Sequence, residues 1–332
     1  MKMLLTILMA AVYATAAAQG PQGPRRQAEM TDPSVHDPVV AFCEGRYYLF
    51  CTGFGVTQMS SSDLRTWKFE KQVLSPVPEW ARQAVPGYNG HTWAPDIIFR
   101  DGTYYLYYSC STFGKNTSAI GVATNRTLNT ESPDYQWVDH GMVLQSLPYR
   151  DMWNAIDPNV IVDGDGTPWM VFGSFWDGIK LTRLDKSMLR LSEPQQWFSL
   201  CRRERAVTDD SAPGTGAVEA PFIFYKDGWY WLFVSTDYCC RGKDSTYKVQ
   251  VGRSSTVTGP YLDRDGRSML DGGGTVVVAG NGRYPGVGHT ATVTFNGRDY
   301  LFFHGYDETR NGQSVLLIRE IDWSTGWPQV TL

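Results

Sequence analysis

Apolar and polar positions along this chain follow one pattern five times. Each unit opens on a polar residue beside a proline or glycine, continues as an apolar run, reverses at a short turn and returns as an aromatic-rich run. Two such runs joined by a turn of the Asp-Gly or Asn-Gly type are typical of a β-hairpin. The five predicted turns are Glu44-Gly45, Asp101-Gly102, Asp165-Gly166, Asp227-Gly228 and Asn296-Gly297.

The openings of these units recur at a long and nearly constant interval. A period of this length, built from strands rather than helix pairs, is typical of the blades of a β-propeller. We therefore predict an all-β fold, a five-bladed β-propeller that forms a single domain over residues 32–332. The openings are Asp37-Pro38, Ala94-Pro95-Asp96, Asp157-Pro158, Glu219-Ala220-Pro221 and His289-Thr290-Ala291, with successive spacings of 59, 61, 62 and 70 residues.

Residues 1–18 have the character of an export signal. Lys2 gives a charged start, a short apolar run spans Leu4 to Val12, and small residues lead to Ala18, after which we expect cleavage. The run is shorter than the roughly 20 residues of a membrane-spanning helix, so we expect no membrane span here or later in the chain. Residues 19–31 lack periodicity and are expected to form a flexible leader. The chain is thus expected to be exported, to the periplasm or out of the cell.

The charge balance excludes nucleic acid as a partner. The formal net charge is −4 and 19% of the residues are charged, which leaves no basic field to hold phosphates. A polyuronate would also need ordered Arg and Lys at its site, whereas a neutral sugar polymer would not. The aromatic fraction of 14% fits blade cores and stacking on sugar rings. We expect a neutral polysaccharide as the partner and a monomeric protein.

The six cysteines do not indicate a metal site. They lack CxxC and Cys/His spacing, and adjacent Cys239 and Cys240 could close only a strained ring. Export permits disulfides, but the sequence does not pair them, and free thiols are expected at Cys43, Cys51, Cys110, Cys201, Cys239 and Cys240.

Three of the five openings carry a carboxylate: Asp37, Asp157 and Glu219. Singly, each is typical of a turn or cap residue beside a proline. Equivalent positions of the five blades converge on the propeller axis, however. Carboxylates clustered there raise one another's pKa values, which indicates acid/base catalysis or a bound cation. Two-carboxylate glycoside hydrolysis fits best. Glu219 has the longer reach and an apolar flank, so we predict that it is the general acid, that Asp37 is the general base, and that Asp157 tunes and orients Glu219.

These residues lie in stretches that resemble glycoside hydrolase family 43, and more narrowly its arabinan endo-1,5-α-L-arabinosidases. The resemblance covers nearly the whole mature chain and implies a five-bladed propeller and an inverting hydrolase of pectic arabinan with the same three roles. The stretches are His36-Asp37-Pro38, Trp93-Ala94-Pro95-Asp96, Asn154 to Pro158, Gly173 to Ile179, Gly216 to Pro221, Cys239 to Gly242, Ser245-Thr246-Tyr247 and Gly286 to His289.

The resemblance also implies binding residues. His289 is expected to help hold a hydrated calcium ion near the propeller centre, although the sequence alone favours a hydrogen-bonded core histidine there, since calcium prefers oxygen ligands. The implied sugar contacts are Trp93, Phe113, Gly114, Asn154, Ala155, Ile156, Ser174, Phe175 and Trp176.

Other functions remain open at this point. An exo-acting arabinofuranosidase or a β-xylosidase uses the same propeller and differs in whether loops close the cleft. A retaining fructan-active propeller would use Asp37 as a nucleophile instead. A non-catalytic carbohydrate-binding propeller would need aromatic rings but not three axial acids.

Overall fold

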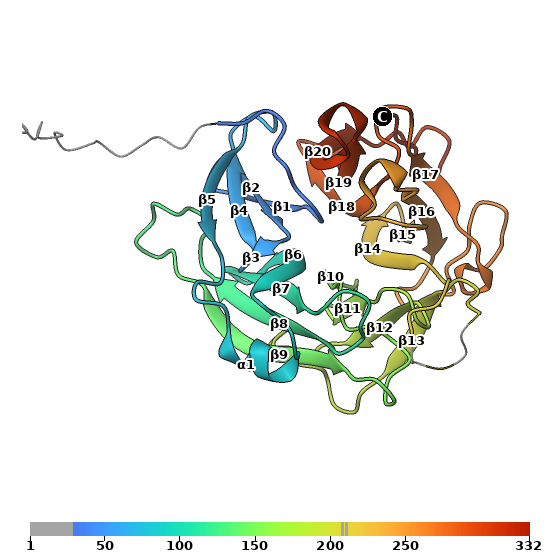
Figure 1. Cartoon of the computed structure of the whole chain (residues 1–332), viewed down its shortest axis with the longest axis horizontal. Coiled ribbons are helices and arrows are strands. Elements are labelled where there is room, and N and C mark those ends of the chain that lie inside the picture. The colour runs from blue at the N-terminus through green and yellow to red at the C-terminus, as the bar shows by residue number, and fades with distance from the viewer. Residues whose placement is uncertain (1–28, 207–208, 210–211) are drawn as a thin grey trace, which may run out of the picture.

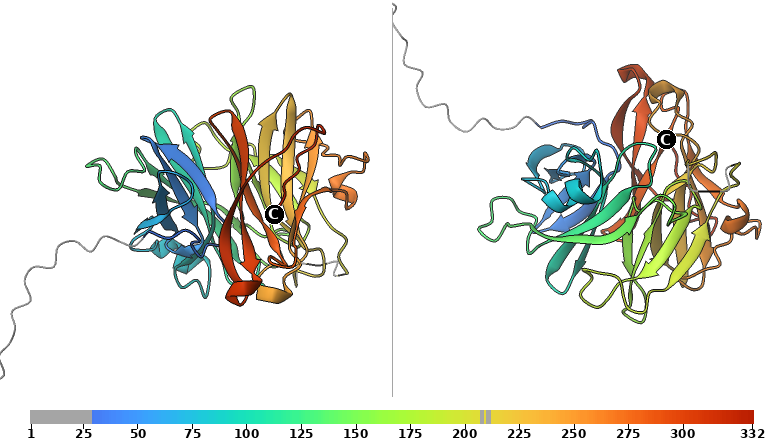
Figure 2. Two further views of the ribbon diagram at one scale, coloured as in Figure 1. Left: turned by 90° about the horizontal axis from the view of Figure 1, so that it is seen from above. Right: turned by 60° about the horizontal axis from the view of Figure 1, so that its bottom comes forward.

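Five antiparallel sheets stand around a central axis in the computed structural model (Figure 1). The structure describes residues 29–206, 209 and 212–332; the predicted signal segment and residues 19–28 of the predicted leader lie outside them. The prediction of a five-bladed all-β propeller is confirmed. Figure 2 shows the sheets from two further sides.

Each sheet is one blade, and its strands follow one another in sequence, except that β3 of the first repeat pairs with the sheet of blade 2. Blade 1 has β1 (Val39–Cys43), β2 (Arg46–Cys51), β4 (Thr57–Ser61) and β5 (Lys68–Gln72); blade 2 has β6 (His91–Arg100), β7 (Thr103–Cys110), β8 (Ser118–Asn125) and β9 (Val138–Ser146), with β3 (Gly53–Phe54) paired to β6. Blade 3 has β10 (Asn159–Val162), β11 (Pro168–Phe172), β12 (Ile179–Arg183) and β13 (Trp197–Cys201). Blade 4 has β14 (Val218–Lys226), β15 (Trp229–Thr236), β16 (Lys248–Ser254) and β17 (Thr275–Ala279), and blade 5 has β18 (Val287–Phe295), β19 (Arg298–Asp307) and β20 (Gln313–Glu320).

Helical structure is sparse in the described residues. One short helix, α1 (Glu79–Ala84), lies outside blade 2, and three single 3₁₀ turns cover Gly242–Asp244, Met269–Asp271 and Glu308–Arg310. No helix in the described part of the chain is long and apolar enough to cross a membrane.

Four of the five predicted turns are tight two-residue turns. At Glu44-Gly45, for example, both residues have positive φ, and Cys43 pairs with Arg46 across the turn. The prediction at Asp165-Gly166 is wrong in length, because β10 and β11 are joined by five residues, 163–167. The Asp163 carboxylate accepts the backbone N–H groups of Asp165 and Thr167 there, which stabilises the wider loop.

Buried side chains join neighbouring blades. Phe50, Leu106 and Phe302 belong to one core cluster and come from blades 1, 2 and 5. A hydrogen bond of 3.2 Å from the Leu316 N–H to the Pro33 carbonyl also links blade 5 to the segment before β1. The described chain is attached from Met30, which exchanges two backbone hydrogen bonds with Trp67. The predicted leader therefore ends before Met30 and not at residue 31.

A non-glycine residue of positive φ lies near the start of the first long strand of every blade, either just before the strand or among its first four residues. These residues are Asp37, Ala94, Asp157, Ala220 and His289, with φ between 44° and 57°. The true repeat position is therefore Ala94 rather than Asp96, and Ala220 rather than Glu219. Glu219 precedes the equivalent position by one residue, so only Asp37 and Asp157 are true counterparts among the acids. Such a conformation costs on the order of 1–3 kcal/mol and persists only where the surroundings enforce it.

The backbone N–H of each of these five residues donates to a side chain of a neighbouring blade. The accepting residue lies in or directly after the second strand of that blade, or is its opening residue. The pairs are Asp37 to His304 Nδ1 (3.2 Å), Ala94 to Thr52 Oγ1 (2.9 Å), Asp157 to Ser109 Oγ (3.0 Å), Ala220 to Asp157 Oδ2 (3.1 Å) and His289 to Ser235 Oγ (2.8 Å). These bonds cross from blade to blade around the axis, and we call them the axial ring.

Replacing Ser235 with Ala is expected to destabilise the protein by about 1–3 kcal/mol, because the His289 N–H would be left without its acceptor at a buried place. Ser235 is 1% exposed. Urea denaturation measures the change, with the exposed Ser62→Ala as a control that should differ from the unchanged protein by less than about 0.5 kcal/mol. Equal losses for the two variants would contradict a role for the axial ring.

Candidate active site

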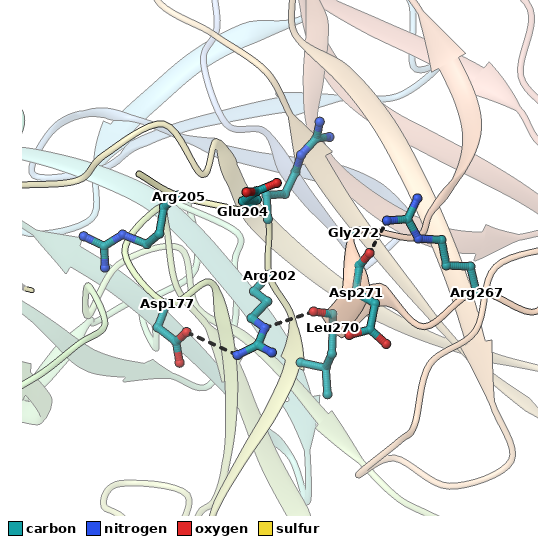
Figure 3. Close-up of a pocket in the computed structure, with 9 residues that line it drawn as sticks. Asp177, Arg202, Glu204, Arg205, Arg267, Leu270, Asp271 and Gly272 are labelled. Carbon is teal, nitrogen blue, oxygen red and sulfur yellow. Dashed lines mark hydrogen bonds and ion pairs between the residues drawn. The ribbon is translucent and has the colours of Figure 1, made fainter. Parts of the chain in front are cut away.

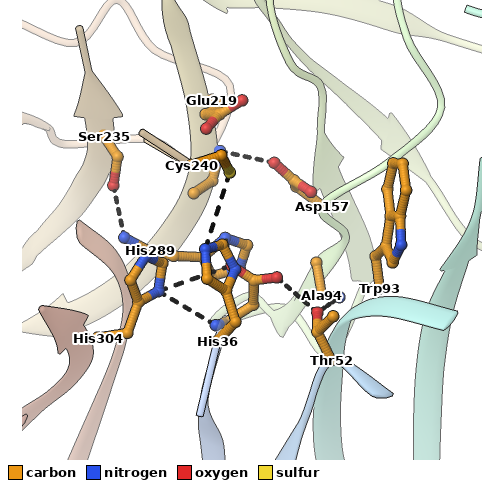
Figure 4. Close-up of polar contacts among 12 residues, drawn as sticks. His36, Thr52, Trp93, Ala94, Asp157, Glu219, Ser235, Cys240, His289 and His304 are labelled. Carbon is orange, nitrogen blue, oxygen red and sulfur yellow. Dashed lines mark hydrogen bonds and ion pairs between the residues drawn. The ribbon is translucent and has the colours of Figure 1, made fainter. Parts of the chain in front are cut away.

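Three acidic side chains from three blades face one another near the axis. Asp37 precedes β1, Asp157 precedes β10, and Glu219 is the second residue of β14. Figure 4 shows Glu219 and Asp157 on one side of the cluster and His36, His289 and His304 on the other. The charges of both Glu219 and Asp37 act on Asp157. The sequence-predicted acids thus share one site, although Asp37 and Glu219 are 182 positions apart.

The carboxylate of Asp37 is held by groups that favour its ionised form. Its Oδ1 lies 2.7 Å from Nδ1 of His36 and 3.0 Å from Nδ1 of His289. Its Oδ2 accepts a 2.5 Å hydrogen bond from the Thr52 hydroxyl. Burial alone would raise the pKa of Asp37, but the charges and hydrogen bonds of the two imidazoles hold it well below its usual value. Asp37 is therefore an ionised group in a fixed orientation.

Glu219 has the opposite character. Its two carboxyl oxygens accept hydrogen bonds from Ser174 Oγ at 2.7 Å and from Tyr247 Oη at 2.8 Å. Burial raises the pKa of Glu219, although both hydrogen bonds act in the opposite direction. A carboxyl that keeps its proton closer to neutral pH is suited to donate it.

Asp157 lies beside Glu219 and supports the backbone that carries it. Its Oδ2 accepts the N–H of Ala220, the residue directly after Glu219. Burial raises the pKa of Asp157 to about 8, with further contributions from the charges of Glu219 and Asp37 and with His289 opposing them. The sequence analysis attributed raised pKa values to the clustering of the carboxylates. Burial is instead the principal cause of the raised pKa of both Glu219 and Asp157.

Two of the predicted sugar-binding segments lie side by side. The Gly173 N–H donates to the Ile156 carbonyl at 2.9 Å, and the Phe175 N–H donates to the Val218 carbonyl at 2.8 Å. Residues 154–157 and 174–176 are therefore joined to each other and to the strand that carries Glu219. The side-chain oxygen of Asn154, three residues before Asp157, is buried without a hydrogen-bond partner.

The predicted sugar contacts differ in how much surface they offer. Ala155, Ile156 and Trp176 are buried, so their side chains can shape the wall but have little surface for a ligand. Trp93 and Phe175 are half-buried, and Trp93 Nε1 donates to His91 Nδ1 at 2.9 Å. Phe113 is 81% exposed and Gly114 is also exposed, both on the loop between β7 and β8. No described contact ties that loop to the three acids.

Several residues that shape the site were not predicted from the sequence. Thr52 bonds both Asp37 and the Ala94 N–H, and Tyr247 bonds Glu219. His36 and His304 stack with ring centroids 3.8 Å apart beside Asp37. Tyr247 and His36 were within the stretches that carried the family resemblance, so they could have been found there, whereas Thr52 and His304 have no such signal.

One group of described residues has the spacing to hold a metal ion. His36, Asp37 and His304 offer ligand atoms within 4.8 Å of one another. Calcium prefers six to eight oxygens, which two imidazoles and one carboxylate do not supply. The Nδ1 atoms of His36 and His304 are also used in contacts with Asp37, so we assign none of the three to a metal. His289 also contacts Asp37 through Nδ1, so a calcium ion near it fits only with water as most of its shell.

A cavity of about 640 Å³ lies away from this cluster, between blades 3 and 4. Four arginines and three acidic residues take part in its lining (Figure 3). Arg202 contacts Asp177 at 3.9 Å and donates to the Leu270 carbonyl at 2.9 Å. None of the predicted site residues lines this cavity, so the candidate active site is the axial cluster.

Comparison with known proteins gives one family over almost the full described chain. The sequence model described as Glycosyl hydrolases family 43 matches residues 31–328. An extracellular exo-α-(1→5)-L-arabinofuranosidase of Cellvibrio japonicus is 50% identical over 298 residues, which cover 89% of this chain and 86% of that protein. An extracellular endo-α-(1→5)-L-arabinanase of Bacillus subtilis is 42% identical, with coverage of 89% and 87%.

A solved structure has the same fold. The α-L-arabinanase of Cellvibrio cellulosa, in a complex with arabinohexaose, has a TM-score of 0.89 and 49% sequence identity to this chain. The match covers 90% of this chain and 96% of that one.

Replacing Asp157 with Asn is expected to flatten the dependence of stability on pH. The unfolded carboxyl titrates near 4 and the folded one near 8, so its contribution is fully present below about pH 4 and is lost as the pH rises through 8. In urea denaturation, the midpoint of the unchanged protein should fall from pH 5 to pH 8 by more than that of the variant. The exposed Asp134→Asn should keep the original slope. Equal slopes for Asp157→Asn and the unchanged protein would refute the buried, protonated state of Asp157.

Proposed function

Because this chain belongs to the glycosyl hydrolases of family 43, we propose that it hydrolyses the α-1,5-L-arabinofuranosidic bonds of arabinan by inversion. The observation that carries this proposal is the contrast between two carboxyl groups at one axis. The pKa of Asp37 is held low and the pKa of Glu219 is raised. Two-carboxylate hydrolysis needs one group of each kind. The choice of sugar rests on the relatives at 50% and 42% identity, which are named as enzymes of α-1,5-L-arabinan.

In this mechanism Asp37 is the general base. It is ionised, and the Thr52 hydroxyl and two imidazoles fix its direction, so it accepts a proton from a water that attacks the anomeric carbon. Glu219 is the general acid and protonates the departing glycosidic oxygen. Asp157 acts on Glu219 by holding the Ala220 N–H and through its charge state. The pKa values of Asp37 and Glu219 shift in opposite directions because Asp37 faces two imidazoles, whereas the half-buried Glu219 faces two hydroxyls.

The mode of cleavage has two candidates. Sequence analysis predicts internal cleavage, as in the endo-arabinanase of Bacillus subtilis at 42% identity. The 50% identity to an exo-acting relative favours release from a chain end as the second candidate. A β-xylosidase activity has no support among these relatives. The half-buried rings of Trp93 and Phe175 supply stacking surface for a neutral sugar in either mode.

Three further proposals concern the setting of the enzyme. The two relatives named above are called extracellular, which supports export of this chain. All three acids come from one chain, which is consistent with a monomer. A hydrated calcium ion near His289 remains part of the proposal, and it would supply positive charge near the ionised Asp37.

Replacing Glu219 with Gln should lower kcat on linear arabinan by about 10²–10⁴-fold, because the variant cannot protonate the leaving oxygen. On an aryl arabinofuranoside with a good leaving group, which needs little protonation, the loss should be much smaller. Asp37→Asn should lose activity on both substrates, and the exposed Glu79→Gln serves as the control. Unchanged sugar release by Glu219→Gln would refute the catalytic role and favour a carbohydrate-binding propeller.

Product analysis on debranched arabinan should distinguish the two modes of cleavage. We expect mixed oligosaccharides from the start of digestion for internal cleavage, whereas a single small product from the outset would establish exo action. Xylan should stay intact in the same assay. The first product should have inverted anomeric configuration by NMR, and retention would contradict Asp37 as a base.

A chelator should lower the rate of arabinan hydrolysis if calcium supports the site. An unchanged rate and an unchanged melting temperature would remove calcium from the proposal.

A further inference from the structure

An exposed thiol lies against the histidine that holds Asp37. Cys240 Sγ is 3.8 Å from Nε2 of His36 and 3.8 Å from Oη of Tyr306. Figure 4 shows Cys240 on the same side of the cluster as Glu219, with the contact to His36 drawn. The backbone holds this residue in place, since Cys240 has φ of 64° and its N–H donates to Tyr306 Oη at 2.7 Å.

These contacts form a chain of three groups, Cys240–His36–Asp37. Nδ1 of His36 contacts Asp37 at 2.7 Å, and Nε2 of the same ring lies 2.8 Å from Tyr306 Oη and 3.8 Å from the sulfur of Cys240. A nucleophile beside a base that is oriented by a third group is the arrangement that activates cysteine in enzymes. Stacking on His304 keeps the imidazole in this orientation. The geometry gives Cys240 a place for its proton and an open side toward solvent.

The other cysteines differ from Cys240 in access. Cys43, Cys51, Cys110 and Cys201 are buried and Cys239 is intermediate, whereas Cys240 is exposed. Buried thiols in apolar surroundings are inert, while an exposed thiol beside an imidazole is reactive. In agreement, the pKa of Cys240 is lowered to about 5, first by a hydrogen bond from Cys239 and also by His36, while burial raises the pKa of Cys51 to about 12.

We propose that Cys240 is a modification site for low-molecular-weight disulfides, and that its modification switches off hydrolysis. The Cys240 thiolate attacks one sulfur of a disulfide R–S–S–R. A Cys240 S–S–R bond forms and the R–S–S–R bond breaks; the leaving thiolate R–S⁻ takes up the proton that left Cys240, from His36 or from water. The small disulfide is reduced to one thiol while Cys240 is oxidised, so electrons balance.

The adduct on Cys240 persists because Cys239 cannot displace it easily. Consecutive α-carbons are about 3.8 Å apart across a trans peptide, whereas disulfides usually need about 4.4–6.8 Å between their α-carbons. A ring between Cys239 and Cys240 is therefore strained, and the mixed disulfide remains until an external thiol reduces it. Small disulfides accumulate in oxidising compartments outside the cytosol.

The effect of the adduct on hydrolysis rests on the proposed function. An added group on Sγ lies against His36, which holds the Oδ1 of Asp37. Cys240 also lies on the same side of the cluster as Glu219 (Figure 4), so the added group comes close to the proposed general acid. Both the orientation of the base and access of the sugar are then impaired.

Purified protein, first reduced and then freed of reductant, is treated with 2-hydroxyethyl disulfide, and peptide mass spectrometry locates the adduct. We expect one adduct, on Cys240, and at least a tenfold loss of arabinan hydrolysis that dithiothreitol reverses. Cys239→Ser should still be modified at Cys240 and inhibited in the same proportion, whereas Cys240→Ser should keep its own starting rate after treatment. His36→Gln should slow adduct formation at least tenfold.

Two results would overturn the proposal. One is an unmodified Cys240 under conditions that modify free thiols of a small peptide, and the other is a fully modified Cys240 with unchanged hydrolysis. If untreated protein does not cleave arabinan at all, the proposed function fails. The mass spectra still decide whether Cys240 is the reactive thiol, and the rate of His36→Gln still decides whether the imidazole activates it.

Discussion

The axial ring of hydrogen bonds is the constraint on which the site depends. At each blade opening a residue with positive φ turns its N–H toward a side chain of a neighbouring blade, from Thr52, Ser109, Asp157, Ser235 or His304. The strained backbone is maintained because each N–H has a buried acceptor. The same turn brings the side chains of Asp37, Asp157 and His289 to the axis. The hydrogen bonds that link the blades around the axis therefore also position the side chains of the candidate site.

The site separates its carboxyl groups by environment. Asp37 is surrounded by imidazoles and a hydroxyl that favour the anion, while Asp157 and Glu219 are buried close to each other and to fewer compensating charges. Charge in a buried place is costly unless it is paired. An ionised Asp37 beside two carboxyls whose pKa values are raised therefore lowers the cost of burying the three groups together. It is also the arrangement that acid/base cleavage of a glycosidic bond needs.

His36 connects Asp37 to three further side chains around the candidate site. Its one ring nitrogen contacts Asp37 and the other faces Tyr306 and Cys240, and its ring stacks on His304. Each of these partners of His36 is therefore two contacts away from Asp37, the proposed general base. The exposed sulfur is the member of this group that outside reagents can reach, which is why the position of Cys240 matters for the enzyme as a whole.

The sequence by itself determined the number of blades, the hairpins and the three acids, because turn residues and strand runs are local signals that recur with the repeat. It placed Glu219 one residue away from its true phase and missed the wide loop at residues 163–167 and the attachment of Met30. Only the tertiary structure decided which groups surround each acid. Thr52, His304 and Tyr247 reach the site from other strands, and burial, which sets the pKa values of Asp157 and Glu219, is a property of the closed ring rather than of any segment.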